Sequence, residues 1–245
     1  QEKPHVNYLI ALVAGNFKKI ESKYRDIPIA FYTPASLIEY AQNSFDGTAD
    51  MLEFYEKEIG VPYPWDKYYQ AVVEDFVAGG MENTSLTILT ERTLHADETE
   101  NIRSSQSLVA HELVHQWFGD YVTCKDWSHT WLNEGFATFY EDLYDGYKNG
   151  RDSMLAGLYG TASYLLADRP EHKPIVFRLY ERAGEQFDYR TYSKAGWVLH
   201  ILRTELGEQM FRDCVKTYLE RHALGTVVTE DFRSVIEELT GRSYD

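Results

Sequence analysis

The sequence has few cysteines, no long apolar run and no excess of basic residues. Its two cysteines, Cys124 and Cys214, form no CxxC pair. A scaffold of several disulfides is therefore excluded at this chain length. Two free, buried thiols are expected, and a single disulfide between them is the alternative. The apolar run from Tyr8 to Ala14 is too short to cross a bilayer, and no signal-peptide pattern is present.

The chain is strongly acidic, with 39 Asp and Glu against 24 Lys and Arg and a formal net charge of −15. This balance disfavours nucleic acid as a partner, because phosphate binding requires clustered Lys and Arg. An acidic surface attracts cationic ligands, such as a peptide with a free amino terminus, although most of these acids are expected only to keep the protein soluble. The lack of a signal-peptide pattern and of a membrane-spanning run, together with only two cysteines, slightly favours a cytoplasmic location. The sequence does not indicate an oligomeric state.

The pattern of apolar residues predicts an α+β fold, with a mixed α/β lobe over residues 1–98 and an all-helical lobe over 99–245. The expected strands are His5–Ala14, Tyr69–Phe76 and Ser85–Thr90, and the expected helices lie within Pro34–Ile59 and at 100–118, 131–147, 152–167, 191–206, 208–223 and 230–240. The chain starts inside an expected strand and stops just past a helix end. We therefore expect one domain, 1–245, cut from a larger polypeptide.

The segment from His111 to His115, with the sequence HELVH, has the HExxH pattern within an expected helix. Residues four apart on a helix are displaced by about 40° and 6 Å, so both imidazoles leave one face and can reach one metal ion. Glu112 lies beside that face, where it can contact a metal-bound water instead of the metal. The motif arises by chance in roughly a few per cent of such sequences, so further support is needed.

A third ligand must come from elsewhere, because catalytic zinc usually has three protein ligands and a water. Glu134 follows His115 after an interval of eighteen residues and opens an expected amphipathic helix. His129 lies nearby and is the rival ligand, but it lies in the expected loop, so Glu134 is preferred. Thr138 and Glu141 follow one and two turns later, and either could accept the second N–H of a metal-bound imidazole.

Two longer segments, HELVHQWFGD at 111–120 and WLNEGFATFYE at 131–141, resemble the gluzincin zinc aminopeptidases, which include aminopeptidase N and the bifunctional leukotriene hydrolase. The run Gly79-Gly80-Met81-Glu82-Asn83 is similar to the G-x-M-E-N motif of that family. Tyr192 precedes Ser193-Lys194, where the family carries its catalytic tyrosine before a lysine. The resemblance covers nearly the whole chain.

The resemblance implies a thermolysin-like catalytic domain that binds one zinc ion per chain through His111, His115 and Glu134. Glu112 would act as general base toward a zinc-activated water, and the hydroxyl of Tyr192 would stabilise the oxyanion. The expected function is a zinc metalloaminopeptidase, a hydrolase that cleaves the N-terminal peptide bond. The N-terminal β domain and the C-terminal helical domain that flank the catalytic domain in the family are not in this chain.

In the family, the glutamate of G-x-M-E-N binds the α-ammonium of the substrate, and this role is carried over to Glu82 within the substrate-binding segment formed by Gly79, Gly80, Met81, Glu82 and Asn83. The two glycines would let an extended substrate approach the backbone, although by themselves they indicate only a turn. A thermolysin-type zinc endopeptidase is the alternative, since it needs no ammonium anchor. A non-catalytic binding scaffold is disfavoured, because Glu112 and all expected ligands are intact.

Overall fold

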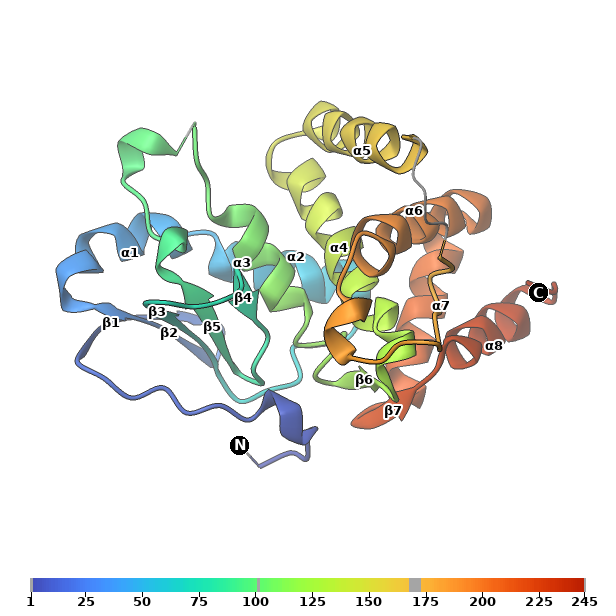
Figure 1. Cartoon of the computed structure of the whole chain (residues 1–245), viewed down its shortest axis with the longest axis horizontal. Helices are drawn as coiled ribbons and strands as arrows, with labels where there is room; N and C mark the ends of the chain where they lie inside the picture. Colours follow the sequence, from blue (N-terminus) through green and yellow to red (C-terminus); the bar gives the residue numbers. More distant parts are fainter. Residues whose placement is uncertain (1, 101, 168–172, 245) are drawn as a thin grey trace.

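The protein has a sheet in its N-terminal part and mainly helices in its C-terminal part (Figure 1). The computed structural model describes residues 2–100, 102–167 and 173–244, so residue 101 of the expected helix 100–118 lies outside the described residues. This order of elements confirms the expected mixed first part and helix-rich second part. In the described part of the chain, no helix combines the length and the apolar character that crossing a membrane requires.

Five strands form one mixed sheet in the order β1-β2-β3-β5-β4. The strands are β1 (Phe17–Tyr24), β2 (Ile27–Pro34), β3 (Tyr68–Val73), β4 (Gly80–Met81) and β5 (Leu86–Thr90). β1 and β2 form an antiparallel hairpin, β3 and β5 continue the sheet in parallel, and β4 pairs antiparallel with β5. The short edge strand β4 therefore carries two residues of the G-x-M-E-N-like segment.

Eight α-helices are described. They are α1 (Ile38–Phe45), α2 (Thr48–Ile59), α3 (Gln106–Val114), α4 (Trp131–Lys148), α5 (Arg151–Leu166), α6 (Ala195–Leu206), α7 (Glu208–Arg221) and α8 (Thr229–Thr240). α1 and α2 pack against β1, and α3 lies between β4 and α4. α4 is the centre of the second part, because it contacts α3, α5, α6 and the π-helical turn Arg190–Lys194 that precedes α6.

The second part is not all-helical, which corrects the sequence-based expectation. The strands β6 (Val122–Cys124) and β7 (Gly225–Val227) form a parallel pair within it. Each has only three residues, too few for an alternating pattern to show in the sequence. Cys124 in β6 and Cys214 in α7 are both free and buried, as expected.

The first part differs from expectation in four strands. The expected strand His5–Ala14 is wrong, because Asn7–Leu9 forms a 3-10 turn and Ile10 and Leu12 are 68% and 91% exposed, without a sheet to bury them. Strands β2 and β4 were not expected. Neither was β1, since most of its side chains are polar and exposed. Pairing with β2, and not an apolar face, holds it.

Two expected helices are also corrected. The helix within Pro34–Ile59 is two helices, α1 and α2, which are separated at Asp46–Gly47. The hydroxyl of Thr48 donates to the carbonyl of Phe45 at 2.9 Å where the chain turns, so it satisfies an acceptor at the end of α1. The helix expected at 100–118 is shorter, since α3 covers only Gln106–Val114.

α4 and the segment that enters α6 approach closely at Gly135. A β-carbon at this position would lie 2.5 Å from the β-carbon of Ala195 and 3.4 Å from the carbonyl oxygen of Thr191. Neither atom can be moved by rotating a side chain. The missing side chain of Gly135 therefore sets the distance between α4 and the π-helical turn Arg190–Lys194.

We expect Gly135→Ala to lower the free energy of unfolding by about 1–2 kcal/mol, because overpacking costs about 1–3 kcal/mol while alanine regains up to about 1 kcal/mol of helix propensity. Gly160→Ala in α5 is the matched control, since a β-carbon there meets no atom within 4 Å. It should be neutral or stabilising. Urea unfolding measures both variants, and equal stability of the two would contradict the close packing at Gly135.

Candidate metal centre and active site

His111 and His115 leave the same side of α3, as the HExxH spacing predicts. The opposite face of the helix packs in the core through the fully buried residues Val109, Ala110, Leu113 and Val114. This burial fixes the rotation of α3 about its axis, so both imidazoles face α4. Their ring centroids lie 4.9 Å apart.

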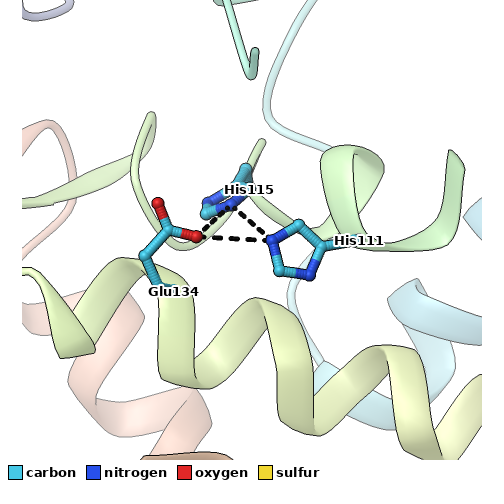
Figure 2. Close-up of side chains that lie close together, drawn as sticks. All are labelled: His111, His115 and Glu134. Carbon is cyan, nitrogen blue, oxygen red and sulfur yellow. Dashed lines mark hydrogen bonds and ion pairs between the residues drawn. The ribbon is translucent and has the colours of Figure 1, made fainter. Parts of the chain in front are cut away.

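Glu134 reaches the two imidazoles from the first turn of α4 (Figure 2). Its Oε2 lies 3.3 Å from Nε2 of His111 and 3.2 Å from Nε2 of His115, and the two nitrogens lie 3.3 Å apart. Ligand atoms of a tetrahedral zinc site, each about 2.0–2.1 Å from the ion, are separated by about 3.3–3.4 Å. The triangle of these three atoms therefore has the size of a zinc site.

The outer nitrogens of both imidazoles face oxygen acceptors. Nδ1 of His115 lies 2.8 Å from the carbonyl oxygen of Phe118, and Nδ1 of His111 lies 3.0 Å from a carboxylate oxygen of Glu141. A carbonyl oxygen can only accept, so Nδ1 of His115 carries a proton, and Nε2 presents a lone pair when the ring is neutral. Glu141, and not Thr138, thus takes the second N–H of His111. The triangle joins electron-rich atoms, which is the arrangement that a cation stabilises.

His129, the rival ligand, lies outside this triangle. It is buried, and its Nδ1 lies 2.9 Å from the hydroxyl of Thr229 and accepts the backbone N–H of the same residue at 3.1 Å. It therefore contacts the start of α8. Among the residues that the structure describes, the group of His, Cys, Asp or Glu side chains arranged to hold a metal is His111, His115 and Glu134.

A cavity of about 650 Å³ opens onto the triangle. Its lining brings together all the sequence-predicted site residues except one: Gly79, Gly80, Met81, Glu82, His111, Glu112, His115, Glu134 and Tyr192. The exception is Asn83, which is buried and donates its side-chain amide to the carbonyl oxygen of Leu9 at 3.0 Å. Segments that are far apart in the sequence thus share one space.

Glu112 is buried beside the triangle, and its Oε2 has no hydrogen-bond partner among the described residues. Burial raises the pKa of its carboxyl to about 7. The carboxylate lies against the backbone of β4, since a β-carbon at Gly80 would be 2.3 Å from Oε1 of Glu112. The edge strand and the expected base are therefore in direct contact.

Glu82 is only 7% exposed and lies in the same cavity. Its backbone carbonyl accepts the side-chain amide of Gln116 at 3.2 Å, and its Oε1 accepts the hydroxyl of Tyr8 at 3.3 Å. Burial raises the pKa of the Glu82 carboxyl. The backbone and side chain are thus both held by hydrogen bonds.

Tyr192 lies in the π-helical turn Arg190–Lys194, and its ring stacks on His111 with centroids 6.0 Å apart and planes at 18°. Such turns are rare and recur at functional sites. The buried Arg190 anchors this one through hydrogen bonds to the Asp188 carboxylate and the carbonyl of Glu185. Burial, followed by the neighbouring carboxylate of Glu134, raises the pKa of the Tyr192 hydroxyl, so it stays protonated and can donate a hydrogen bond.

The cavity has a strongly negative lining. Glu82, Glu112, Glu134 and Glu141 all contribute to it, and no Lys or Arg occurs among its described lining residues. Such a space favours cationic ligands. It can hold a metal ion at the triangle and a second positive group near Glu82.

The sequence did not reveal three aromatic residues of this lining, Tyr8, Trp127 and Phe187. Trp127 contacts the other two, with ring centroids 5.2 Å from Tyr8 and 5.7 Å from Phe187. All three lie outside the recognisable motifs, and aromatic residues are common in this chain. No signal in the sequence distinguishes them from core aromatics.

Comparison with known proteins places these features in a family. The model of the peptidase family M1 domain matches residues 43–244. The chain is 33% identical to aminopeptidase M1-C of Oryza sativa subsp. japonica. The aligned region covers 98% of this chain and 29% of that protein. The chain is also 33% identical to aminopeptidase 2 of Candida albicans, over 96% of this chain and 26% of that protein.

A further relative is endoplasmic reticulum aminopeptidase 1 of Mus musculus, which is 30% identical over 91% of this chain. The chain spans only 25–29% of the length of these three relatives. The family model, in contrast, matches most of the chain. The chain therefore belongs to peptidase family M1, the gluzincin aminopeptidases that its motifs resemble.

Proposed function

We propose that this chain is the thermolysin-like catalytic domain of a zinc-dependent aminopeptidase, which hydrolyses the N-terminal peptide bond of peptides. The observation that carries this proposal is that Glu82, Glu112 and the His111–His115–Glu134 triangle line one cavity. One space thereby offers a metal site, a base and an anchor for a free amino terminus. The names of the relatives, all aminopeptidases, support the same activity.

His111, His115 and Glu134 would hold one zinc ion per chain. The spacing of their three facing atoms, and the N–H at Nδ1 of His115 that leaves Nε2 to face the metal position, fit the nitrogen and oxygen ligands that zinc prefers. When bound, zinc supplies Lewis acidity, which polarises a scissile carbonyl and lowers the pKa of a water. Glu141 and the carbonyl of Phe118 keep the imidazoles in the orientation that presents both lone pairs.

Glu112 would act as general base and then as general acid. It takes a proton from the attacking water and delivers it to the leaving amine. A carboxyl whose pKa is about 7 can perform both transfers near neutral pH. Its unpartnered Oε2 is free to accept a hydrogen bond from that water.

Glu82 would bind the α-ammonium of the substrate, and Tyr192 would donate a hydrogen bond to the carbonyl oxygen as negative charge develops on it. A carboxylate–ammonium contact in a partly desolvated cavity is strong and directional. The ring of Tyr192 stacks on the ring of His111, and its protonated hydroxyl lies near the carboxylate of Glu134. These two contacts would fix the scissile bond between the anchor and the base.

A thermolysin-type zinc endopeptidase is the second candidate. It would use the same triangle and the same base, but it would bind the middle of a peptide and would have no ammonium to place beside Glu82. A buried carboxylate with no cationic partner in the cavity is costly. The position of Glu82 therefore favours the aminopeptidase.

The metal assignment predicts that the purified protein carries one zinc per chain and that His115→Ala loses it, because only two ligands remain. His129→Ala is the control and should keep the metal, since His129 contacts Thr229 instead. Elemental analysis of folded protein measures both. Full zinc content in His115→Ala, or loss in a folded His129→Ala, would show that the ligand set is wrong.

The base assignment predicts that Glu112→Gln retains zinc and loses at least about 10²-fold in kcat on an aminoacyl amide. Glutamine has nearly the shape of glutamate but cannot accept the proton of the water. The measurement pairs steady-state kinetics with zinc content on the natural, full-length protein. Activity within a few fold of wild type at full zinc occupancy would assign the proton transfer to another group.

The anchor assignment decides between the two candidate functions. Wild type should cleave a peptide with a free amino terminus and reject its acetylated form, which would leave the buried Glu82 carboxylate unpaired. Glu82→Ala should raise KM for the free peptide and lower kcat/KM by at least about 10²-fold, without loss of zinc. If wild type cleaves both peptides equally and Glu82→Ala changes neither rate, the endopeptidase replaces the aminopeptidase.

A further inference from the structure

We propose that Tyr8 is a positioning residue for the ammonium anchor: its hydroxyl orients the carboxylate of Glu82, so that one oxygen stays available for the amino terminus of the substrate. The proposal rests on the proposed function and deepens it. It adds a residue from the N-terminal segment, which lies outside every motif recognised in the sequence.

The direction of the hydrogen bonds around Tyr8 follows from their chemistry. Its hydroxyl lies 3.3 Å from Oε1 of Glu82 and 3.3 Å from Nδ2 of Asn133. An amide nitrogen can only donate, so the hydroxyl accepts from Asn133 and its own proton points to Glu82. The bond engages Oε1 and leaves Oε2 of Glu82 without this donor.

The carboxylate of a glutamate needs such a donor to hold one orientation. The last torsion of a glutamate side chain is broad, so packing of the methylene groups alone does not fix the plane of the carboxylate. Glu82 has no Lys or Arg beside it in the described lining of the cavity. The hydroxyl of Tyr8 is the side-chain donor that the structure places on its oxygens.

Tyr8 is itself held in place by residues of the site. The next residue, Leu9, is buried, and its carbonyl oxygen accepts the side-chain amide of Asn83 at 3.0 Å. The ring of Tyr8 contacts Trp127 edge to face, with centroids 5.2 Å apart and planes at 68°. The G-x-M-E-N-like segment thus contacts the 3-10 turn twice, because Glu82 binds Tyr8 while Asn83 fixes the turn that carries it.

Asn133 connects this arrangement to the metal triangle. It directly precedes Glu134 in α4, and its Oδ1 accepts the backbone N–H of Cys124 in β6 at 3.0 Å. That bond fixes the amide, so its nitrogen faces Tyr8. The relative position of the ammonium anchor and the metal ligands is therefore maintained through the path from Asn133 to Tyr8 to Glu82.

The test compares Tyr8→Phe with Tyr24→Phe in the natural, full-length, zinc-loaded protein. Tyr24 is a matched control, because its hydroxyl also donates to a glutamate, Glu56, at 2.9 Å, and neither residue lines the cavity. We expect Tyr8→Phe to raise KM for a free dipeptide amide about 10-fold with a smaller change in kcat, as for the loss of one hydrogen bond to a charged group. Tyr24→Phe should leave both constants unchanged.

A double-mutant cycle with Glu82→Ala separates a positioning role from a structural one. In the Glu82→Ala background, Tyr8→Phe should have no further effect on KM, because the group that it orients is absent. Equal kinetics of Tyr8→Phe and wild type, or an undiminished effect in the Glu82→Ala background, would overturn the proposal. So would a Tyr8→Phe protein with reduced zinc content or a melting temperature far below that of Tyr24→Phe.

The failure of this proposal differs from failure of the proposed function. If Glu82→Ala impairs cleavage of the free peptide while Tyr8→Phe behaves as Tyr24→Phe does, the ammonium anchor stands and Tyr8 has no part in it. If wild type cleaves free and acetylated peptides equally, the anchor itself is wrong, and the role of Tyr8 falls with it.

Discussion

Three electron-rich atoms are held 3.2–3.3 Å apart where α3 meets α4, and the rest of the site depends on this contact. Glu134 and His115 are almost fully buried, so water cannot screen the repulsion between the carboxylate and the lone pairs. Although burial favours a neutral ring, Glu134 and Glu82 raise the pKa of His115 to about 9. The site thus attracts positive charge even without a substrate. The packing of the opposite face of α3 in the core offsets the free-energy cost of holding these three atoms close together.

The same preference for positive charge extends across the cavity. Glu82 and Glu112 line the same cavity outside the triangle, and neither has a Lys or Arg as a partner in the described lining. A globular protein seldom buries several carboxylates together without cationic partners, since burial of each carboxylate has a desolvation cost. A metal ion at one end and an ammonium group at the other would balance these charges. The cavity is therefore acidic like the chain as a whole, whose composition by itself indicates only solubility.

The sequence predicted those parts of the site that depend on local geometry. Two histidines four residues apart on a helix must share a face. A glutamate that opens the next helix can meet them, although the spacing alone left His129 as a rival to Glu134. The motif residues carried over by resemblance were also found around one cavity, apart from Asn83. Long-range contacts could not be read from the pattern. The segment around Tyr8 was expected to be a strand, but its position is set by Asn83, 74 residues later than Leu9. Likewise, β1 exists because β2 pairs with it, and its own side chains do not show this.

The first turn of α4 explains why these separate segments act as one site. Successive residues on a helix point about 100° apart, so three neighbours reach three different surroundings. Asn133 binds Tyr8 and Cys124, Glu134 faces the two imidazoles, and Gly135 admits the backbone of the turn that carries Tyr192. A displacement of this turn would shift the proposed ammonium anchor, the proposed metal ligand and the proposed oxyanion donor together. The site therefore needs α4 to be rigid, and α4 lies at the centre of the helical part, packed by α3, α5 and α6.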